Sequence, residues 1–170
     1  MSGPPSVVPL TSGDLGRVLA LNNAHAVETS PLDGPRLTAL HRAAFRATGI
    51  GAGAEAFLIA LDQGAAYGSP NFLWFRDRYP RFVYVDRVVT APACRGRGFA
   101  RALYADLFAA AEAAGHDRVV CEVNSDPPNP ASAAFHAGLG FREVGAASLA
   151  PGGKAVRYLL RALPHDGDRR

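Results

Sequence analysis

A glycine-rich segment near the middle of the chain combines the features of a site for a phosphate group. Arg95, Arg97 and Arg101 supply positive charge, and Gly96 and Gly98 lie between them. Glycine lets the backbone approach a ligand without a Cβ atom in the way. A helix beginning here would add unpaired N–H groups and the positive end of its dipole. We therefore expect a turn whose backbone amides bind a diphosphate.

The elements around this segment are the ones that such a turn needs. The β-branched and aromatic run Phe82–Thr90 predicts a strand that leads into the turn. The apolar spacing after Gly98 predicts a helix as far as Ala114, ended by Gly115. A further strand is expected over Arg118–Val123. The order strand, glycine turn, helix, strand favours an α/β protein with a parallel crossover.

Two other nucleotide-binding patterns fit less well. The dinucleotide fingerprint requires a third glycine where Arg101 stands, although Glu122 lies where a ribose-binding acid would lie. Only about seventy residues follow the turn, too few to complete a doubly wound domain. The P-loop is excluded because no Gly-Lys-Ser/Thr sequence is present. A nicotinamide-dependent oxidoreductase is thus a distant alternative, which a binding titration with NAD would test.

The rest of the chain predicts further elements on both sides of this unit. These are an edge strand over 7–10, a helix from Thr11 and Asp14 to Ala26, a helix over 36–46, a buried strand over 56–61, an irregular aromatic-rich connection over 62–81, a short helix capped by Asn129, and a hairpin over 142–150 and 155–163. We predict one mixed α/β domain over 7–163, with disordered ends over 1–6 and 164–170.

Composition excludes several classes of protein. The net charge of +3 is small for 170 residues, and the one dense group of arginines suits a single anionic ligand better than a nucleic acid. No stretch reaches the ~20 apolar residues of a membrane span, and the N-terminus does not read as a signal peptide. Cys94 and Cys121 have no metal-type spacing, so we expect reduced thiols, no metal and a cytoplasmic location.

Two motifs resemble those of the GNAT superfamily of acetyl-CoA-dependent N-acetyltransferases. The run Arg95-Gly96-Arg97-Gly98-Phe99-Ala100 fits that family's pyrophosphate motif, Gln/Arg-x-x-Gly-x-Gly/Ala, at each fixed position. The run from Asn129 to Phe141 resembles a second pattern, Asn-x-x-Ala-x-x-x-Tyr-x-x-x-Gly-Phe. In this chain Ser132 replaces the alanine and His136 replaces the tyrosine. The resemblance covers residues 82–163 well and the N-terminal third by general layout.

The resemblance implies a fold, a cofactor and an activity. The fold is a single domain with a mixed, mostly antiparallel sheet, flanked by helices, in which a central parallel pair of strands splays apart. The cofactor is acetyl-CoA, and the activity is transfer of an acetyl or short acyl group to an amine by direct attack in a ternary complex. The residues implied in cofactor binding are Val88, Val89, Thr90, Arg95, Gly96, Arg97, Gly98, Phe99, Ala100, Arg101, Asn129 and Phe135.

Transfer to an amine needs an acid for the leaving thiolate, a base for the amine proton and a donor for the oxyanion. His136 is the predicted acid, because it occupies the tyrosine position and an imidazolium gives up a proton more readily than a phenol. Glu122 is preferred as the base, because an acid inside an apolar strand needs a reason. Asp86, Glu28 and His25 remain alternatives for the base. The resemblance implies that a main-chain amide near Val88 or Val89 is the oxyanion donor.

The acceptor is expected to be a small amine or an amino acid, with a protein amine also open. Tyr67, Asn71, Trp74 and Tyr79 could line its pocket, or could simply cover the edge of the sheet. Enzymes of this kind are often dimers. The alternative from another class is a module that senses acetyl-CoA without turnover, because His136 departs from the family pattern.

Overall fold

The computed structural model describes residues 3–25, 29–149, 151 and 153–164. Met1, Ser2 and residues 165–170 lie outside the described residues, so disorder of the two ends stays a prediction. Along the described chain the elements are β1 (Val8–Pro9), α1 (Leu15–Ala24), α2 (Gly34–Ala43), β2 (Arg46–Ile50), β3 (Ala56–Asp62), α3 (Pro70–Arg76), β4 (Val83–Thr90), α4 (Phe99–Ala113), β5 (Arg118–Asp126), α5 (Pro130–Gly138), β6 (Arg142–Ser148) and β7 (Ala155–Ala162). Short 3₁₀ turns precede α1 and α4, over Ser12–Asp14 and Pro92–Cys94.

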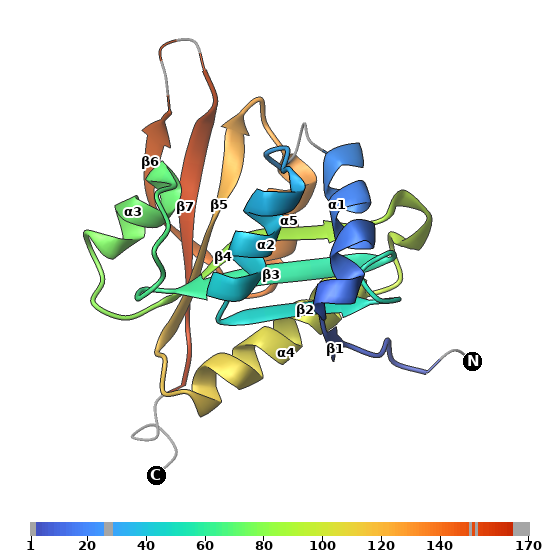
Figure 1. Ribbon diagram of the computed structural model, residues 1–170. Helices are drawn as coiled ribbons and strands as arrows, with labels where there is room; N and C mark the ends of the chain where they lie inside the picture. Colours follow the sequence, from blue (N-terminus) through green and yellow to red (C-terminus); the bar gives the residue numbers. More distant parts are fainter. Residues whose placement is uncertain (1–2, 26–28, 150, 152, 165–170) are drawn as a thin grey trace.

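All the described strands form one seven-stranded sheet in the order β1-β2-β3-β4-β5-β7-β6 (Figure 1). Its one parallel pair is β4–β5, and every other neighbouring pair is antiparallel. The parallel pair is connected through α4, because parallel strands need a crossover long enough to return to the same end of the sheet. The predicted fold class, a mixed and mostly antiparallel sheet with a central parallel pair, is confirmed.

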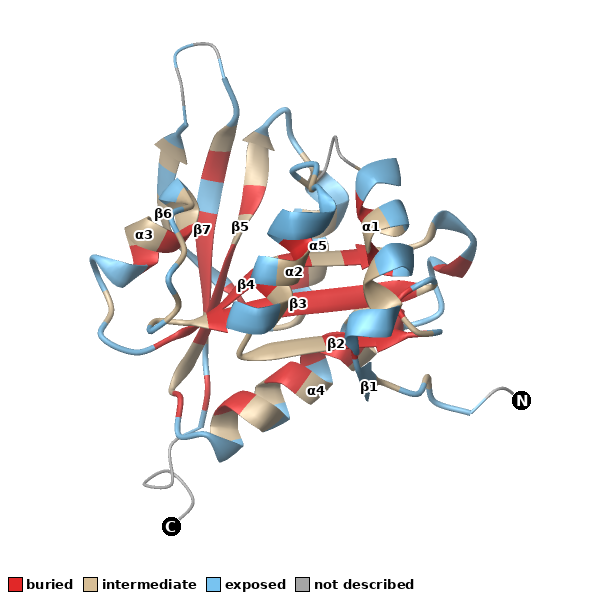
Figure 2. Cartoon of the chain, viewed as in Figure 1, coloured by how far each residue is buried: buried red, intermediate tan, exposed pale blue. Residues whose placement is uncertain are grey.

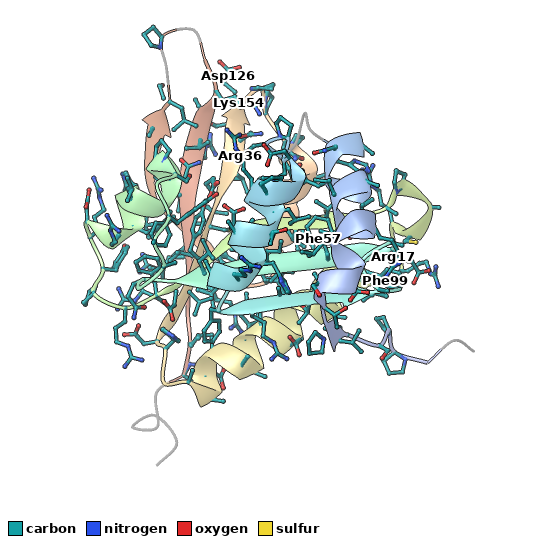
Figure 3. The ribbon with its side chains drawn as sticks, viewed as in Figure 1. Arg17, Arg36, Phe57, Phe99, Asp126 and Lys154 are labelled. Atoms are coloured by element: carbon teal, nitrogen blue, oxygen red, sulfur yellow. The ribbon has the colours of Figure 1, made fainter. Side chains whose placement is uncertain are left out.

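The sheet separates two apolar layers. On one face α1, α2 and α3 bury side chains such as Val18, Leu37 and Phe72, and on the other face α4 packs through Leu103 and Leu107 with α5 beside it. β3 is covered on both faces, so its first six residues are fully buried (Figure 2). Phe57 of this strand, labelled in Figure 3, has no exposed surface. This continuous burial explains why β3 reads as an unbroken apolar run.

Two elements differ from the sequence predictions. The helix predicted over 36–46 ends at Ala43, and the strand β2, which was not predicted, begins at Arg46 and pairs with β3 over five residues. The connection predicted to be irregular over 62–81 contains α3, so the prediction is wrong there. α3 is one short helix that starts at Pro70 and is fixed by burying Phe72 and Phe75. Its formation depends on tertiary packing, because seven residues rich in aromatic side chains have little helical stability alone.

Several local predictions are confirmed. The N–H group of Thr11 donates to the Asp14 carboxylate (2.8 Å) at the predicted start of the first helical segment. Asn129 caps α5, its side-chain oxygen accepting from the N–H group of Ser132 (3.2 Å). The proline-containing strand β1 lies at an edge of the sheet, as expected for a residue that cannot donate to a ladder.

Candidate active site

The predicted phosphate-binding turn has the backbone conformation that its glycines require. Gly96 and Gly98 both have a φ of 77°, in the left-handed region that L side chains rarely adopt. A Cβ atom at either position would meet nothing within 4 Å, so the backbone is open to a ligand. α4 begins directly after Gly98, at Phe99, and is fifteen residues long. The turn therefore presents the unpaired amides of a long helix to open space.

The arginines of the turn flank this opening, and within the described part of the chain none of them forms an ion pair with an acid. Arg95, Arg97 and Arg101 are exposed, and the guanidinium of Arg97 lies over the Phe99 ring, 4.7 Å from its centre. Phe99 itself is buried and anchors the start of α4 in the apolar layer. Backbone amides, a positive helix end and exposed cations are the groups that bind a diphosphate, so the segment has the chemistry of a site for such an anion.

β4 and β5 separate after a short contact. Their parallel pairing joins Val83 with Val119 and Tyr84 with Val120, and no pairing follows along the described strands. β4 also contains an irregularity, since Val85 pairs with Ala60 and Arg87 with Ile59, which leaves Asp86 as an extra residue opposite β3. Such a bulge bends a strand and disturbs its ladder. The expected splay between the strands that carry Val88 and Cys121 is therefore present.

A cavity of about 290 Å³ occupies the gap between these strands. It is lined by residues of both layers of the molecule, so it passes through the sheet. On the α4 and α5 side it reaches Tyr104, Asn129, Ser132 and His136; on the α3 side it reaches Tyr67, Ser69, Asn71 and Tyr84; and in the gap it reaches 85–88 and 121–124. The lining also includes Lys154, which lies near Asp126 where β5 ends and β7 begins (Figure 3).

Glu122 is the centre of a hydrogen-bond network on the α3 side of the gap. The Tyr84 hydroxyl donates to its carboxylate (2.9 and 3.0 Å to the two oxygens), and the Asn71 amide donates to Oε1 (3.0 Å). Tyr158 in turn donates to the Asn71 side-chain oxygen (2.9 Å). These contacts hold Glu122 in one orientation at the wall of the cavity.

Burial raises the pKa of Glu122 to about 8, and the negative charge of Asp86 adds to this increase. The hydrogen bonds from Tyr84 and Asn71 oppose it, because they stabilise the carboxylate. A carboxyl group with a pKa close to neutral pH can both take and release a proton under cellular conditions. Glu122 thus has the properties of a general base.

His136 lies on the α5 side of the same cavity and is 5% exposed. Its Nδ1 is 2.7 Å from the Ser132 carbonyl oxygen, which can only accept, so Nδ1 carries a proton. Its Nε2 is 2.7 Å from the Tyr104 hydroxyl, which donates to it when the imidazole is neutral. Burial lowers the pKa of His136, although the bond to Ser132 opposes this. The neutral imidazole is therefore favoured at neutral pH, which weakens the expectation of a ready imidazolium donor.

Asp86, one of the alternatives for the base, forms a buried ion pair with Arg87. Arg87 Nε lies 2.7 Å from Asp86 Oδ2, and Tyr67 donates to the other Asp86 oxygen (2.5 Å). Arg87 Nη1 also donates to Asn22 Oδ1 (2.9 Å) and to the Ser30 carbonyl (3.0 Å). This network ties the bulge of β4 to α1 and to the segment that leads into α2. Asp86 is committed to these partners, which leaves Glu122 as the better candidate for the base.

The structure brings most of the predicted site residues to one place. Val88, Glu122, Asn129 and His136 line the cavity, and the turn over 95–101 lies at the start of α4. Val89 and Thr90 belong to β4 beyond the separation from β5. Phe135 packs against both Tyr104 and His136.

The aromatic residues predicted to line an acceptor pocket divide into two groups. Tyr67 and Asn71 line the cavity. Trp74 instead stacks on Tyr158 (4.1 Å between ring centres), and Tyr79 packs against Phe75. Glu28, one of the alternatives for the base, lies outside the described residues.

Sequence reasoning missed four tyrosine and serine contributions to the site. Tyr84 and Tyr158 have their hydroxyls on the Glu122 network, and Tyr104 and Ser132 contact His136. A signal existed for Ser132, since it replaces the alanine of the motif four residues before His136. Tyr104 lies on the apolar face of α4 and is indistinguishable there from a core residue.

The fold and the cleft between the parallel strands define an acyltransferase type of α/β domain, and the sequence comparison agrees. Residues 21–141 match the family described as Acetyltransferase (GNAT) family. The chain therefore belongs to the GNAT acetyltransferase family. No protein with curated function matches the chain.

Solved structures with the same fold cover nearly the whole chain. Ard1 from Thermoplasma volcanium superimposes with a TM-score of 0.74 at 12% identity, covering 96% of this chain and 100% of its own. Naa20 from Chaetomium thermophilum, in complex with a bisubstrate analogue, superimposes with a TM-score of 0.69 at 20% identity, covering 97% of this chain and 90% of its own. The yncA protein from Salmonella typhimurium, solved with its cofactor acetyl-CoA, gives 0.67 at 17% identity, covering 96% and 97%. At these identities the likeness is one of fold.

The described residues form neither a metal site nor a membrane-spanning helix. Within the described residues, no group of three His, Cys, Asp or Glu side chains is placed to hold a metal ion. No helix in the same part of the chain has the length and apolar character needed to cross a membrane.

Proposed function

We propose that the protein is an N-acetyltransferase that transfers an acetyl or short acyl group from acetyl-CoA to an amine by direct attack in a ternary complex. The observation that carries this proposal is the cavity through the sheet. It joins the α4 and α5 side, where the turn begins α4, to the α3 side, where Glu122 has its hydrogen bonds. Such a passage allows a cofactor and an acceptor to meet from opposite faces of the sheet.

The residues proposed for coenzyme A lie on the α4 and α5 side. The amides around Gly96 and Gly98, with Arg95, Arg97 and Arg101, would hold the pyrophosphate. The splayed part of β4, from Val88 to Thr90, would offer main-chain groups to the pantetheine arm, with Asn129 and Phe135 beside it. When bound, acetyl-CoA supplies an acetyl group activated as a thioester.

Glu122 is proposed as the general base. An amine in the cavity would face its carboxylate from the α3 side, and the fixed orientation given by Tyr84 and Asn71 would place the accepting oxygen. With its pKa raised to about 8, Glu122 accepts a proton more strongly than an ordinary carboxylate does.

His136 is proposed as the acid on the opposite side of the gap. In its imidazolium form Nδ1 keeps its bond to Ser132, and Nε2 carries the second proton towards Tyr104. The lowered pKa makes this form a minority at neutral pH and a stronger acid when it forms. Its contribution should therefore be larger at the acidic end of the pH range.

An assay for free thiol tests the proposal directly. Purified protein with acetyl-CoA should release CoA only when an amine from a small panel is added, and the amide product should be visible by mass spectrometry. The panel should include simple amines, amino acids and short peptides. Binding of acetyl-CoA without acceptor-dependent release across the panel would favour the sensing module instead.

A further inference from the structure

A second hollow lies beside the cavity, on the α2 side of the sheet. It has a volume of about 360 Å³ and lies between α2 and the segment that leads into α3. Apolar side chains line most of it: Pro31, Leu32, Ala39, Leu40, Ala43 and Ala66. We name these residues the apolar groove. No Asp or Glu is found among the described residues that line it.

The apolar groove is continuous with the cavity. Ser30, Tyr67, Ser69 and Arg87 line both. Arg87 is buried and already paired with Asp86, so the shared wall carries no uncompensated charge. The groove therefore begins where the acceptor side of the cavity ends, on the same face of the sheet as the Glu122 network.

The sequence keeps the groove shallow and apolar. Ala39 and Ala43 are four residues apart on α2, so they lie on one face of the helix and leave space above the buried Leu40. Both alanines are exposed in the absence of an occupant. Arg36, one turn before Leu40 on α2 (Figure 3), adds a cation to the lining. Arg36 Nε lies 3.8 Å from Asp33 Oδ2, so its charge is partly balanced by an acid outside the lining. An apolar chain is the better occupant, because a second ammonium group would find no Asp or Glu in the lining.

We propose that the acceptor is a primary amine with an apolar arm, whose amine reaches Glu122 in the cavity while the arm lies in the apolar groove. This proposal rests on the proposed function, and it names the class of acceptor. A polyamine is disfavoured, because its second charge would lose its hydration among apolar side chains, with no Asp or Glu in the lining to pair with it.

A series of linear amines from methylamine to hexylamine tests the proposal with acetyl-CoA as donor. These amines have nearly equal basicity, so differences in kcat/KM report the contact of the arm. Burial of a methylene group is worth ~0.8 kcal/mol, which predicts an increase of up to about fourfold per methylene until the groove is filled. 1,6-Diaminohexane, of the same length as hexylamine, should be the poorer acceptor because of its second charge.

Ala39→Asp places a charge in the groove at an exposed helix position. This variant should lower the ratio of kcat/KM for hexylamine to kcat/KM for methylamine to about one. Ala109→Asp makes the same change at an exposed alanine of α4, outside the groove, and should keep the ratio of the parent. Titration of hexylamine into the acetyl-CoA complex should also shift the amide NMR signals of Ala39, Ala43 and Ala66.

The outcomes separate this proposal from the proposed function. Turnover of amines without dependence on chain length, or an unchanged ratio in Ala39→Asp, overturns the groove proposal and leaves the acetyltransferase intact. Absence of turnover with every amine overturns the proposed acetyltransferase function. The NMR titration then tests by itself whether the apolar groove binds hexylamine. If hexylamine leaves the NMR signals of Ala39, Ala43 and Ala66 unchanged, the groove proposal is contradicted, whether or not the protein turns over amines.

Discussion

Replacing Glu122 with Gln is the sharpest test of the base. The amide has almost the same shape, and its oxygen can still accept from Tyr84 and Asn71. The variant cannot take a proton, so kcat should fall by about 10²- to 10⁴-fold, the usual contribution of a general base. Affinity for acetyl-CoA should change little, because Glu122 lies on the other side of the gap from the turn that binds the pyrophosphate.

The raised pKa gives this prediction a definite pH dependence. With a pKa of about 8, the ionised fraction of Glu122 increases about fiftyfold between pH 6 and pH 8. The activity of the parent should increase by a comparable factor over this range and level off above it. The Gln variant should lose the part of the increase that belongs to Glu122. Initial rates of CoA release over pH 5.5 to 9.5 measure this, and the ratio of the parent's rate to the variant's rate cancels the ionisation of the amine itself.

The same shift affects stability, with the opposite sign. Between pH 4.5, the ordinary value, and about 8 the folded protein keeps a proton on Glu122 that the unfolded chain has released. Stability contributed by this group is therefore complete at low pH and is lost as pH rises through this window. The shift corresponds to up to about 5 kcal/mol in the free energy of unfolding.

Urea unfolding at pH 5 and pH 9 measures the stability effect without any acceptor. Glu122→Gln should gain stability over the parent at pH 9 compared with pH 5. Glu143→Gln, at a half-exposed carboxylate, serves as the control and should show no such change. If the Glu122 variant keeps the parent's activity at pH 8, or follows the parent's stability at both pH values, the reasoning about this carboxyl group is refuted.

Three further changes test the rest of the site. Gly98→Val forces a β-branched residue into a φ of 77° and should weaken CoA binding at least about tenfold by calorimetry. Gly16→Val, in α1, is the control and should bind CoA as the parent does. Equal affinity of the two variants would contradict the role of the turn in binding CoA. Tyr104→Phe removes the hydroxyl that donates to neutral His136, so the pKa of His136 should rise in an NMR titration. An unchanged titration curve of His136 would exclude the hydrogen bond from Tyr104. Asp86→Asn removes a charge that raises the pKa of Glu122, so the rising part of the pH–activity profile should move to lower pH. The variant should also lose stability, because the buried Arg87 loses its ion-pair partner. A pH–activity profile that stays in place would show that the charge of Asp86 does not act on Glu122.

The phosphate-binding turn could be predicted because its physics is local. Gly96 and Gly98 have the left-handed conformation that only glycine adopts easily, and α4 begins at the next residue. Asn129 likewise caps its helix through an atom three residues away. Such features depend on neighbours in sequence, so residue type and spacing are enough to find them.

The sequence could indicate Glu122 as the candidate base only because an acid is unusual at that position. An acid between apolar residues of a buried strand requires compensation, which pointed to Glu122. The groups that compensate it come from 38 to 51 positions away, as Tyr84 and Asn71, and no spacing rule connects them. The same limit applies to α3, which is held in place by aromatic contacts with Tyr84 of β4 and Tyr158 of β7.

The sequence by itself determined the fold class, the glycine turn at the start of a long helix, and the separate identities of Glu122 and His136. Only the tertiary structure decided that these two residues face one cavity, that burial and the Tyr104 hydroxyl favour the neutral form of His136, and that an apolar groove opens beside the base. The reason is physical. Backbone conformation is set by neighbouring residues, whereas pKa values and cavities depend on burial and on charges that only folding brings together.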